Sequence, residues 1–344
     1  MGKTQDRHIL IVGAGSMGII MGYILQLSGA EVTFLVRPHR AEALSRPQKL
    51  YSYDDHQLKT YTGYKLITSP SEMLGAGYDY VVITLDGAAL RNEVGQALVK
   101  TIGEAVRGTT TKVIVGTVFI DIRSWFLKAT GLESEQVVSG QLVIHIYPTS
   151  AVTLPVHAPT DEKLLAQADQ AYTDCLGPGM TLGDGSLAAA NDFAQLWNAS
   201  GVSTCNVVSE EQFSLNTSSL FPILAVCELL GWSSFQNLDS TDPLWRLAVA
   251  AVKEIQGLTI HGTIGQQAAG STTDAGIAQV FAGIEKVMLP MDWQSFNRYH
   301  HGAKVNAQDR ELLRVCITMG EADGKPVAAI KDLLQRVEHH ASQA

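Results

Sequence analysis

The chain has few charged residues, few cysteines and no long apolar run. Only 17% of its 344 residues are Asp, Glu, Lys or Arg, against about 25% in ordinary soluble domains. So little charge argues against a disordered chain, a coiled coil and a nucleic-acid-binding protein, because each of these needs more charge. The net charge of −9 also disfavours binding to an anionic membrane surface. The composition therefore favours a compact enzyme, or a subunit with a large buried interface.

The short apolar runs and the scarce cysteines bear on where the protein acts. No run approaches the roughly 20 apolar residues that a membrane span requires, and the polar residues 1–8 do not resemble a signal peptide. The four cysteines lie far apart, with no CxxC pair and no Cys/His spacing suited to zinc. We therefore expect a cytoplasmic protein with reduced thiols, without a metal site, a membrane anchor or a nucleic-acid partner.

Apolar strand and helix patterns alternate over the first 208 residues. Residues 8–13 (HILIVG) are typical of a strand that is buried on both faces, and residues 16–29 predict a helix. Further strands are expected at residues 31–36, 78–85, 112–118, 137–146 and 180–183, and further helices at residues 88–102 and 187–200. This alternation predicts a doubly wound α/β sheet of the Rossmann type.

The pattern changes at residue 209 from strands to long helices. Apolar periodicity predicts helices over residues 209–230, 243–261, 275–287, 308–320 and 326–341. We therefore predict a Rossmann-type nucleotide-binding domain over 1–208, followed by an all-helical domain over 209–344 for substrate binding or dimerisation. The apolar helix within residues 244–260 is either the interface of a homodimer or internal core.

The most specific motif is GAGSMG at residues 13–18. A GxGxxG sequence alone is weak evidence, but this one follows a buried strand and opens a helix. In such a loop the first glycine permits a tight turn, the second lets the backbone approach a pyrophosphate, and the third lets the helix pack on the strand. The alternative is a glycine-rich turn without a ligand. We expect a dinucleotide to bind the whole loop: Gly13, Ala14, Gly15, Ser16, Met17 and Gly18.

The residue that ends the second predicted strand indicates which dinucleotide binds. Proteins that bind NAD usually have Asp or Glu there, to hold the ribose 2′-hydroxyl. This chain has Arg37, with Arg40 just beyond and no acidic residue before Glu42. A guanidinium suits a 2′-phosphate through charge-assisted hydrogen bonds. We therefore predict NADP(H), the alternative being that Arg37 is an ordinary exposed loop residue.

These features together resemble the 2-dehydropantoate 2-reductase (ketopantoate reductase) family. The resemblance rests on the GAGSMG loop, the Arg after the second strand, and the helical second half. It extends to MTLGDGSLAAANDFAQLWNASG at 180–201, to the helical segment 209–232, and to GEADGKPVAAIKDLL at 320–334. It implies a Rossmann-type domain, a helical domain and an NADPH-dependent carbonyl reduction in a cleft between them.

The positions that carry catalysis in that family are substituted in this chain. The family has a Lys four residues before an Asn on the first helix of domain two, and this Lys protonates the substrate oxygen. Here Asn216 matches the Asn, but the Lys position is Gln212, which cannot supply a proton. Three other family positions, a Lys, an Asn-Gly pair and an acidic residue, fall on Asp86, on Thr117 and Val118, and near Ala307 and Gln308. The substitutions predict a substrate other than ketopantoate.

A dense polar stretch at residues 292–309 (DWQSFNRYHHGAKVNAQD) supplies candidates for the missing acid. If 296–304 is helical, His300 and Lys304 share a face, and His301 lies about 100° away. We hypothesise that Lys304, His300 or His301 donates the proton and that Asn216 hydrogen-bonds the reacting oxygen. In the alternative, the two histidines form a solvated pair and Lys304 is a surface charge paired with Asp309. Asp86, similarly, can simply cap the helix that follows it.

Three functions follow from these patterns. The first is an NADPH-dependent oxidoreductase that reduces a ketone, of the 2-keto acid type, or an imine. The second is a non-redox enzyme, such as a cyclase or an isomerase, that kept the fold and lost the hydride-transfer residues. The third is a nucleotide-sensing protein without catalysis. Loss of the family's Lys, Asn and acidic positions favours the second and third functions, and the proton donors in the last third of the chain favour the first two. We predict the first.

Overall fold

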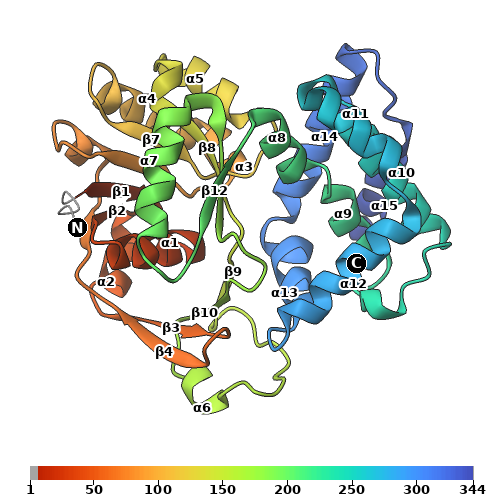
Figure 1. Ribbon diagram of the computed structural model, residues 1–344, viewed down its shortest axis with the longest axis horizontal. Coiled ribbons are helices and arrows are strands. Elements are labelled where there is room, and N and C mark those ends of the chain that lie inside the picture. The colour runs from red at the N-terminus through yellow and green to blue at the C-terminus, as the bar shows by residue number, and fades with distance from the viewer. Residues whose placement is uncertain (1–6, 344) are drawn as a thin grey trace. The chain divides into compact units, whose positions relative to one another are not determined.

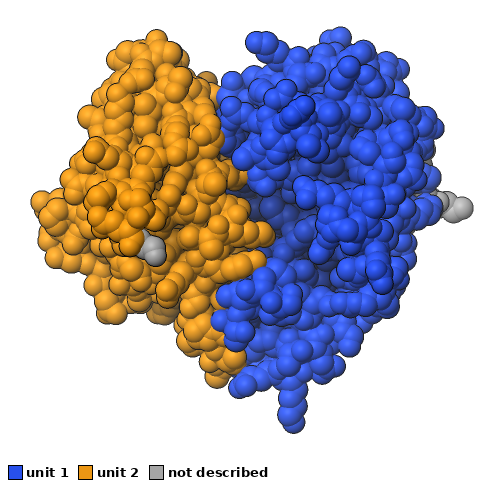
Figure 2. Space-filling model, turned by 180° about the vertical axis from the view of Figure 1, so that it is seen from behind, with its two compact units in different colours: residues 1–153, 159–210 blue, residues 154–158, 211–344 orange. Residues whose placement is uncertain are grey.

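The computed structural model describes residues 7–343, which form two compact units. Unit 1 comprises residues 1–153 and 159–210, and unit 2 comprises residues 154–158 and 211–344 (Figure 2). The division after residue 210 lies two residues beyond the boundary expected from the sequence. The short segment 154–158 belongs to unit 2, which the sequence pattern did not indicate.

Within residues 7–343, unit 1 is built around an eight-stranded sheet with the order β12-β11-β8-β7-β6-β1-β2-β5 (Figure 1). Strands β5, β2, β1, β6, β7 and β8 are parallel to one another, and β11 and β12 run antiparallel to them. This confirms the predicted Rossmann-type sheet. The strands are β1 (His8–Val12), β2 (Glu31–Leu35), β5 (Lys65–Ile67), β6 (Tyr80–Ile83), β7 (Lys112–Val115), β8 (Val137–Leu142), β11 (Met180–Gly183) and β12 (Cys205–Val208).

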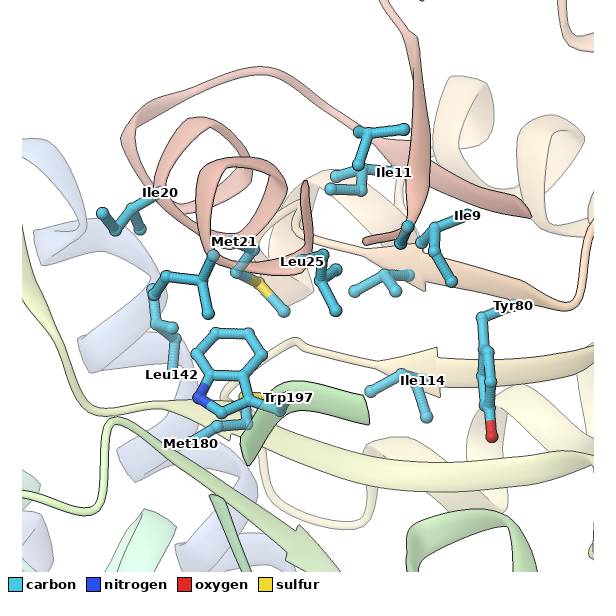
Figure 3. Packing of buried hydrophobic residues seen from close by; sticks show 14 of the residues in the cluster. Ile9, Ile11, Ile20, Met21, Leu25, Tyr80, Ile114, Leu142, Met180 and Trp197 are labelled. Carbon is cyan, nitrogen blue, oxygen red and sulfur yellow. The ribbon is translucent and has the colours of Figure 1, made fainter. Parts of the chain in front are cut away.

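Helices cover both faces of this sheet (Figure 1). One face packs against α1 (Ser16–Leu27) and α7 (Leu187–Asn198), and the other lies under α4 (Glu93–Val106) and α5 (Ile122–Thr130). The strands are apolar on both faces because both are covered. Figure 3 shows the core beneath α1 and α7, which includes Ile9, Ile11, Met21, Leu25, Ile114 and Trp197.

A second sheet in unit 1 was not predicted. It has the order β4-β3-β10-β9, with β3 (Gln48–Ser52), β4 (Gln57–Tyr61), β9 (His145–Pro148) and β10 (Gln170–Thr173). The expected single strand over 137–146 is therefore wrong: β8 ends at Leu142, and β9 pairs with β10 in the second sheet. The apolar run VVSGQLVIHI conceals the bend, because periodicity records burial and not direction.

Two of the predicted helices are each divided in two. Residues 88–102 contain the end of α3 (Gly87–Arg91) and most of α4, with a break at Asn92, whose side chain accepts a hydrogen bond from Gly95 N–H. Residues 209–230 form α8 (Glu210–Ser218) and α9 (Phe221–Leu229). Pro222 stands in the first turn of α9, where its missing N–H costs nothing. Both breaks occur at residues suited to a helix start, which apolar periodicity does not detect.

Helices α9, α10 (Pro243–Gln256) and α15 (Ala328–Gln343) pack together as the core of unit 2. Trp245, Val249, Val252 and Ile255 of α10 are fully buried, so internal core is the role that the structure shows for this apolar helix. The other helices of unit 2 are α11 (Gly262–Ser271), α12 (Asp274–Met288), α13 (Trp293–Tyr299) and α14 (Asn306–Ala322), with a π-helical turn at His300–Lys304.

The remaining elements are short. Unit 1 also has α2 (Pro38–Leu44), α6 (Glu162–Leu165) and 3₁₀ turns at Pro70–Met73, Ser134–Gln136 and Asp184–Ser186, and unit 2 has 3₁₀ turns at Phe235–Asn237 and Thr259–His261. Over residues 7–343, no helix combines the length and the apolar character that a bilayer span requires.

Candidate functional site

The GAGSMG loop begins where β1 ends, at the point where the strand order of the sheet reverses. The chain runs from β1 to β2 and β5 on one side of β1. It then crosses to β6, which pairs with β1 on the other side. Open α/β sheets bind ligands at such a point, at the carboxyl ends of the strands. Gly13 N–H donates to the carbonyl of Leu35 at 3.0 Å. Thr84, just after β6, donates its hydroxyl to the carbonyls of Val12 and Gly13. The loop is thus held by both neighbouring strands.

Each glycine of the loop has a separate structural reason. Gly13 has φ +102°, where a side chain would be strained, and an added Cβ would lie 2.9 Å from Thr84 Oγ1. A Cβ on Gly18 would lie 2.1 Å from the Gly13 carbonyl oxygen, so this glycine permits α1 to pack on the loop. A Cβ on Gly15 would meet nothing within 4 Å. The open space above Gly15 is what close approach by a phosphate group requires.

The first turn of α1 leaves its backbone N–H groups available. No side chain caps the helix at Gly15. The Ser16 hydroxyl, which could have done so, donates instead to Gln170 Oε1 of β10 at 2.8 Å. Ala14 and Ser16 are buried, and Met17 is half-buried. Since an α-helix starts with unpaired N–H groups and a positive dipole end, the loop fits an anionic pyrophosphate.

Arg37 lies two residues after β2, as the N-cap residue of α2. It stands close to the loop in the fold, because Leu35 at the end of β2 holds Gly13. Arg37 and Arg40 are both exposed, and within the described chain no ion pair occupies either guanidinium. Arg46, by contrast, is bound through two nitrogens to Asp169. These two cations, which follow β2 in the chain, are therefore available to a ligand.

Asp86 and Thr117 both stabilise loops at this edge of the sheet. Asp86 is the N-cap of α3 and accepts a hydrogen bond from Ala89 N–H at 2.7 Å, which is the capping role considered as the alternative. Thr117 is buried and donates to the Leu85 carbonyl at 2.7 Å. The Thr117 contact connects the segments that follow β6 and β7, whereas the Asp86 contact lies within the first turn of α3.

In unit 2, Gln212 and Asn216 lie one turn apart on α8. Gln212 Nε2 donates to Asn216 Oδ1 at 2.7 Å, and Asn216 is exposed. Neither amide has an ionisable proton near neutral pH. The pair can orient a polar group by hydrogen bonding, but it cannot supply an acid.

The polar stretch 292–309 is not one regular helix. Asp292 caps α13, which ends at Tyr299, and a π-helical turn then carries His300, His301 and Lys304. The expected helix over 296–304 is thus α-helical only as far as Tyr299, and Val305 N–H donates to the carbonyl of His300, five residues back. Single π turns inside helices frequently occur at functional sites.

The three candidate acids have different surroundings. His300 stacks on Phe296, with ring centroids 5.5 Å apart, and Lys304 is exposed. His301 Nδ1 lies 2.7 Å from Asp309 Oδ2. The His301 side chain is 18% exposed and that of Asp309 only 8%. Burial raises the pKa of Asp309, and the hydrogen bond with His301 opposes this rise. His301 therefore contacts a buried carboxylate.

A second set of polar residues also binds the turn that carries His301. Asn306 Nδ2 donates both to the His301 carbonyl and to Glu228 of α9. Arg310 donates to the other Glu228 oxygen at 2.8 Å. Sequence reasoning missed the roles of Asp309, Glu228 and Arg310. The sequence did contain a signal for Asp309. It precedes Leu312, Leu313 and Cys316 at the spacing of one helix face, and a carboxylate is unusual on such an apolar face.

Comparison with known proteins finds a family model that the first part of the chain resembles. The family model described as Ketopantoate reductase PanE/ApbA matches residues 9–106, which include the GAGSMG loop and Arg37. The match is confined to this part of unit 1. No protein in the curated set matches the chain.

Solved structures with a similar fold cover nearly the whole chain. The 2-dehydropantoate 2-reductase of Geobacter metallireducens has a TM-score of 0.66 at 18% identity, covering 96% of this chain and 99% of that one. A D-mandelate dehydrogenase with NADH and anilino(oxo)acetate has a TM-score of 0.68 at 13% identity, covering 98% and 99%. The 2-dehydropantoate 2-reductase of Methylococcus capsulatus has a TM-score of 0.65 at 16% identity, covering 98% of this chain and 97% of that one. At these identities the likeness concerns the fold.

The loop at residues 13–18 fits the pyrophosphate of a dinucleotide. The cradle at Gly13 and Gly18 excludes side chains, the space at Gly15 is open, and two unoccupied guanidinium groups lie near the loop. The fold is therefore established, and residues 9–106 resemble the ketopantoate reductase family. Among the described residues, no three His, Cys, Asp or Glu side chains gather as a metal site would need.

Proposed function

We propose that this protein is an NADP(H)-dependent oxidoreductase that reduces a ketone, of the 2-keto acid type, or an imine. The observation that supports this most strongly is the loop at residues 13–18, which is preorganised for a pyrophosphate and lies within residues 9–106, which resemble the ketopantoate reductase family. The family consists of oxidoreductases, which favours redox chemistry over the cyclase, isomerase and sensor alternatives. We further propose that the protein acts in the cytoplasm.

The preference for NADP(H) rests on Arg37. Its exposed guanidinium follows β2, where NAD-binding proteins usually have an acidic residue. Arg40, one turn further, adds a second positive charge. Two cations and no carboxylate at this position favour a 2′-phosphate over a 2′-hydroxyl.

Reduction of a carbonyl requires a hydride on carbon, a proton on oxygen and an anchor for the rest of the substrate. NADPH, when bound, supplies the hydride. The loop at residues 13–18 would hold the pyrophosphate through its backbone N–H groups, and Arg37 would hold the 2′-phosphate. In unit 2, the exposed Asn216 can hydrogen-bond the reacting oxygen or a neighbouring hydroxyl. The proton must come from an ionisable group, and Gln212 is not one.

The substitutions at Gln212, Asp86 and Thr117 favour a substrate other than ketopantoate. Asp86 and Thr117 are engaged in capping and loop contacts, so neither offers a lysine charge or a free amide to a small dicarbonyl compound. We propose a related 2-keto acid or an imine.

The cofactor assignment is tested by measuring NADPH and NADH affinities of wild type and Arg37→Ala. We expect the NADPH Kd to rise by about 10- to 100-fold, corresponding to one lost charge-assisted contact, with the NADH Kd unchanged. Lys128→Ala, which removes an exposed cation from α5, is the control. Equal NADPH binding by wild type and Arg37→Ala would contradict the proposed preference.

Turnover is tested by following NADPH absorbance with pyruvate, 2-ketoisovalerate, ketopantoate and phenylglyoxylate. We expect NADPH to be oxidised faster with at least one of the other three keto acids than with ketopantoate. Binding of NADPH without its oxidation in the presence of any of the four keto acids would contradict reduction of a 2-keto acid and would favour the non-redox alternatives.

A further inference from the structure

We propose that His301 is the residue that protonates the substrate oxygen and that Asp309 positions its ring. This inference rests on the proposed function and names the acid that Gln212 cannot be. It is carried by the geometry of unit 2: a buried carboxylate, a partly exposed imidazole and an irregular turn that presents it.

The first observation is that burial of the Asp309 carboxylate is energetically unfavourable. Asp309 lies inside α14 with its side chain only 8% exposed, and its Oδ1 atom has no hydrogen-bond partner within the described residues. A buried carboxylate oxygen without a partner is unfavourable, and natural structures keep few of them. Its other oxygen holds His301 Nδ1 at 2.7 Å. Structure alone does not need this carboxylate, because an apolar residue would fit the stripe of Leu312 and Leu313 better.

The second observation is the turn itself. His301 lies in the π-helical turn, and the aromatic ring of Trp232 packs against Gly302, whose added Cβ would lie 3.0 Å from Trp232 Cζ2. Trp232 has φ +57°, an unusual conformation for a bulky residue. Strained backbone and π turns concentrate at functional sites, where the surrounding structure holds them in place. Two such deviations meet at the turn that carries His301.

The third observation is the place of His301 beside α8 and α9. The ring of Phe221, the first residue of α9, lies edge-on to His301 with centroids 6.2 Å apart. Asn216 is five residues before Phe221, in the last turn of α8. The imidazole and the exposed amide of Asn216 are therefore carried by adjoining parts of unit 2.

The ring is oriented for proton donation. When Nδ1–H donates to Asp309, the second nitrogen, Nε2, is the atom left to exchange a proton, and within residues 7–343 no hydrogen bond occupies it. In the reaction, the carbonyl carbon receives the hydride of NADPH while its oxygen takes the Nε2 proton. The product is an alcohol, the imidazole is left neutral, and it regains a proton from water. A carboxylate behind an imidazole fixes its tautomer and stabilises its charged form.

The charged and titratable groups around His301 come from each element packed against its turn. They are Glu228 on α9, Asp309 and Arg310 on α14, Arg298 on α13, and His300 and Lys304 on the turn. Glu228 is bound by Arg310. Burial raises the pKa of Tyr299, so this phenol stays neutral. Asp309 is thus the anion that directly contacts the His301 ring.

Unit 2 contains a natural control, a second His–Asp pair. His157 Nε2 lies 2.8 Å from Asp292 Oδ2, at a similar distance but in a more exposed setting. A His→Gln change at each pair removes an ionisable group and retains hydrogen bonding. The two variants therefore separate proton donation from the general effect of breaking a His–Asp contact.

The test compares His301→Gln and His157→Gln with NADPH and the best of the four keto-acid probes. We expect kcat/KM to fall by at least 100-fold in His301→Gln and by less than threefold in His157→Gln, because general acid catalysis contributes about 10²–10⁴. The NADPH Kd should be unchanged in both. A His301→Gln variant within threefold of wild type, or a larger loss in Lys304→Ala, would overturn the assignment.

A second readout does not depend on turnover. Nitrogen NMR of the full chain with labelled histidines should show His301 with its proton on Nδ1 when neutral, and Asp309→Asn should change this tautomer. An unchanged His301 signal in Asp309→Asn would contradict the positioning role. If the wild type binds NADPH but none of the probes is reduced, the proposed function fails, and the NMR result still decides whether Asp309 sets the ring.

Discussion

Two histidine–aspartate pairs of unit 2 have nearly the same nitrogen–oxygen distance, but the pKa of the aspartate is shifted in opposite directions. In the pair of His157 and Asp292, the carboxylate also accepts a hydrogen bond from Ser295 N–H and caps α13. Burial alone would raise the pKa of Asp292, but the hydrogen bonds from His157 and Ser295 outweigh it and lower the pKa. In the pair of His301 and Asp309, burial prevails and the pKa of Asp309 is raised.

The difference shows which pair serves the fold. Asp292 has two donors and starts a helix, so its ionised form is stabilised by contacts that any folded state of unit 2 would keep. Asp309 has one partner, and its second oxygen has none within the described part of the chain. A buried charged group that folding penalises but the chain retains is a candidate for function.

The strongest way to break this comparison is to neutralise each carboxylate. Asp309→Asn should lower kcat/KM by about 100-fold, because an amide can hold the imidazole in the wrong tautomer. Asp292→Asn should change it by less than threefold, since Asn also caps helices well. The measurement is NADPH oxidation with the best keto-acid probe. Equal losses in the two variants would mean that both pairs act only through the structure of unit 2.

A third histidine of unit 2 shows what burial does without a carboxylate. His261 is fully buried, lies 3.3 Å from the Ser218 hydroxyl through Nε2, and has no partner on Nδ1. Burial lowers its pKa from 6.5 to about 4. The unfolded chain therefore takes up a proton below pH 6.5, while the folded chain does so only near pH 4. Stability is lost as the pH falls through this window.

We expect His261 to lower the free energy of unfolding by about 2 kcal/mol between pH 6.5 and pH 4.5, since each unit of pKa shift corresponds to 1.36 kcal/mol. Urea unfolding of wild type and His261→Gln at both pH values measures it. The variant should lose less stability on acidification by about that amount. Parallel losses in the two proteins would show that His261 is not held neutral by burial.

A smaller effect distinguishes the two aspartates by stability. Asp292→Ala removes the cap of α13 and should lower the free energy of unfolding by about 1 kcal/mol. Asp309→Asn should change it by less than about 0.5 kcal/mol, or raise it, because a poorly satisfied buried charge is removed. Denaturant midpoints at pH 7 provide the comparison. A larger destabilisation by Asp309→Asn than by Asp292→Ala would reverse the assigned roles.

The nucleotide half of the molecule could be predicted from the sequence, because its determinants are local. The strand, loop and helix over residues 8–27 depend on apolar runs and on glycines whose reasons are steric, and the structure confirms these elements. The second sheet could not be predicted. Its strands β3, β4, β9 and β10 come from distant segments, and burial of β9 next to β8 makes one apolar run out of two strands.

The proton-donor region could be predicted only as a set of residues. The stretch 292–309 was recognisable by its polarity, but the ranking of His300, His301 and Lys304 depends on burial. The π turn and the contact of His301 with Asp309, eight residues away, are set by packing against α9 and α14. No local pattern encodes these contacts.

The most direct test of the central claim is the pH dependence of kcat/KM in wild type and His301→Gln, with NADPH and the best keto-acid probe. For the wild type we predict a rate that falls at high pH, as the donor loses its proton. For His301→Gln we predict a residual rate, at least 100-fold lower, without that falling limb. A variant that keeps both the rate and the falling limb would contradict the account.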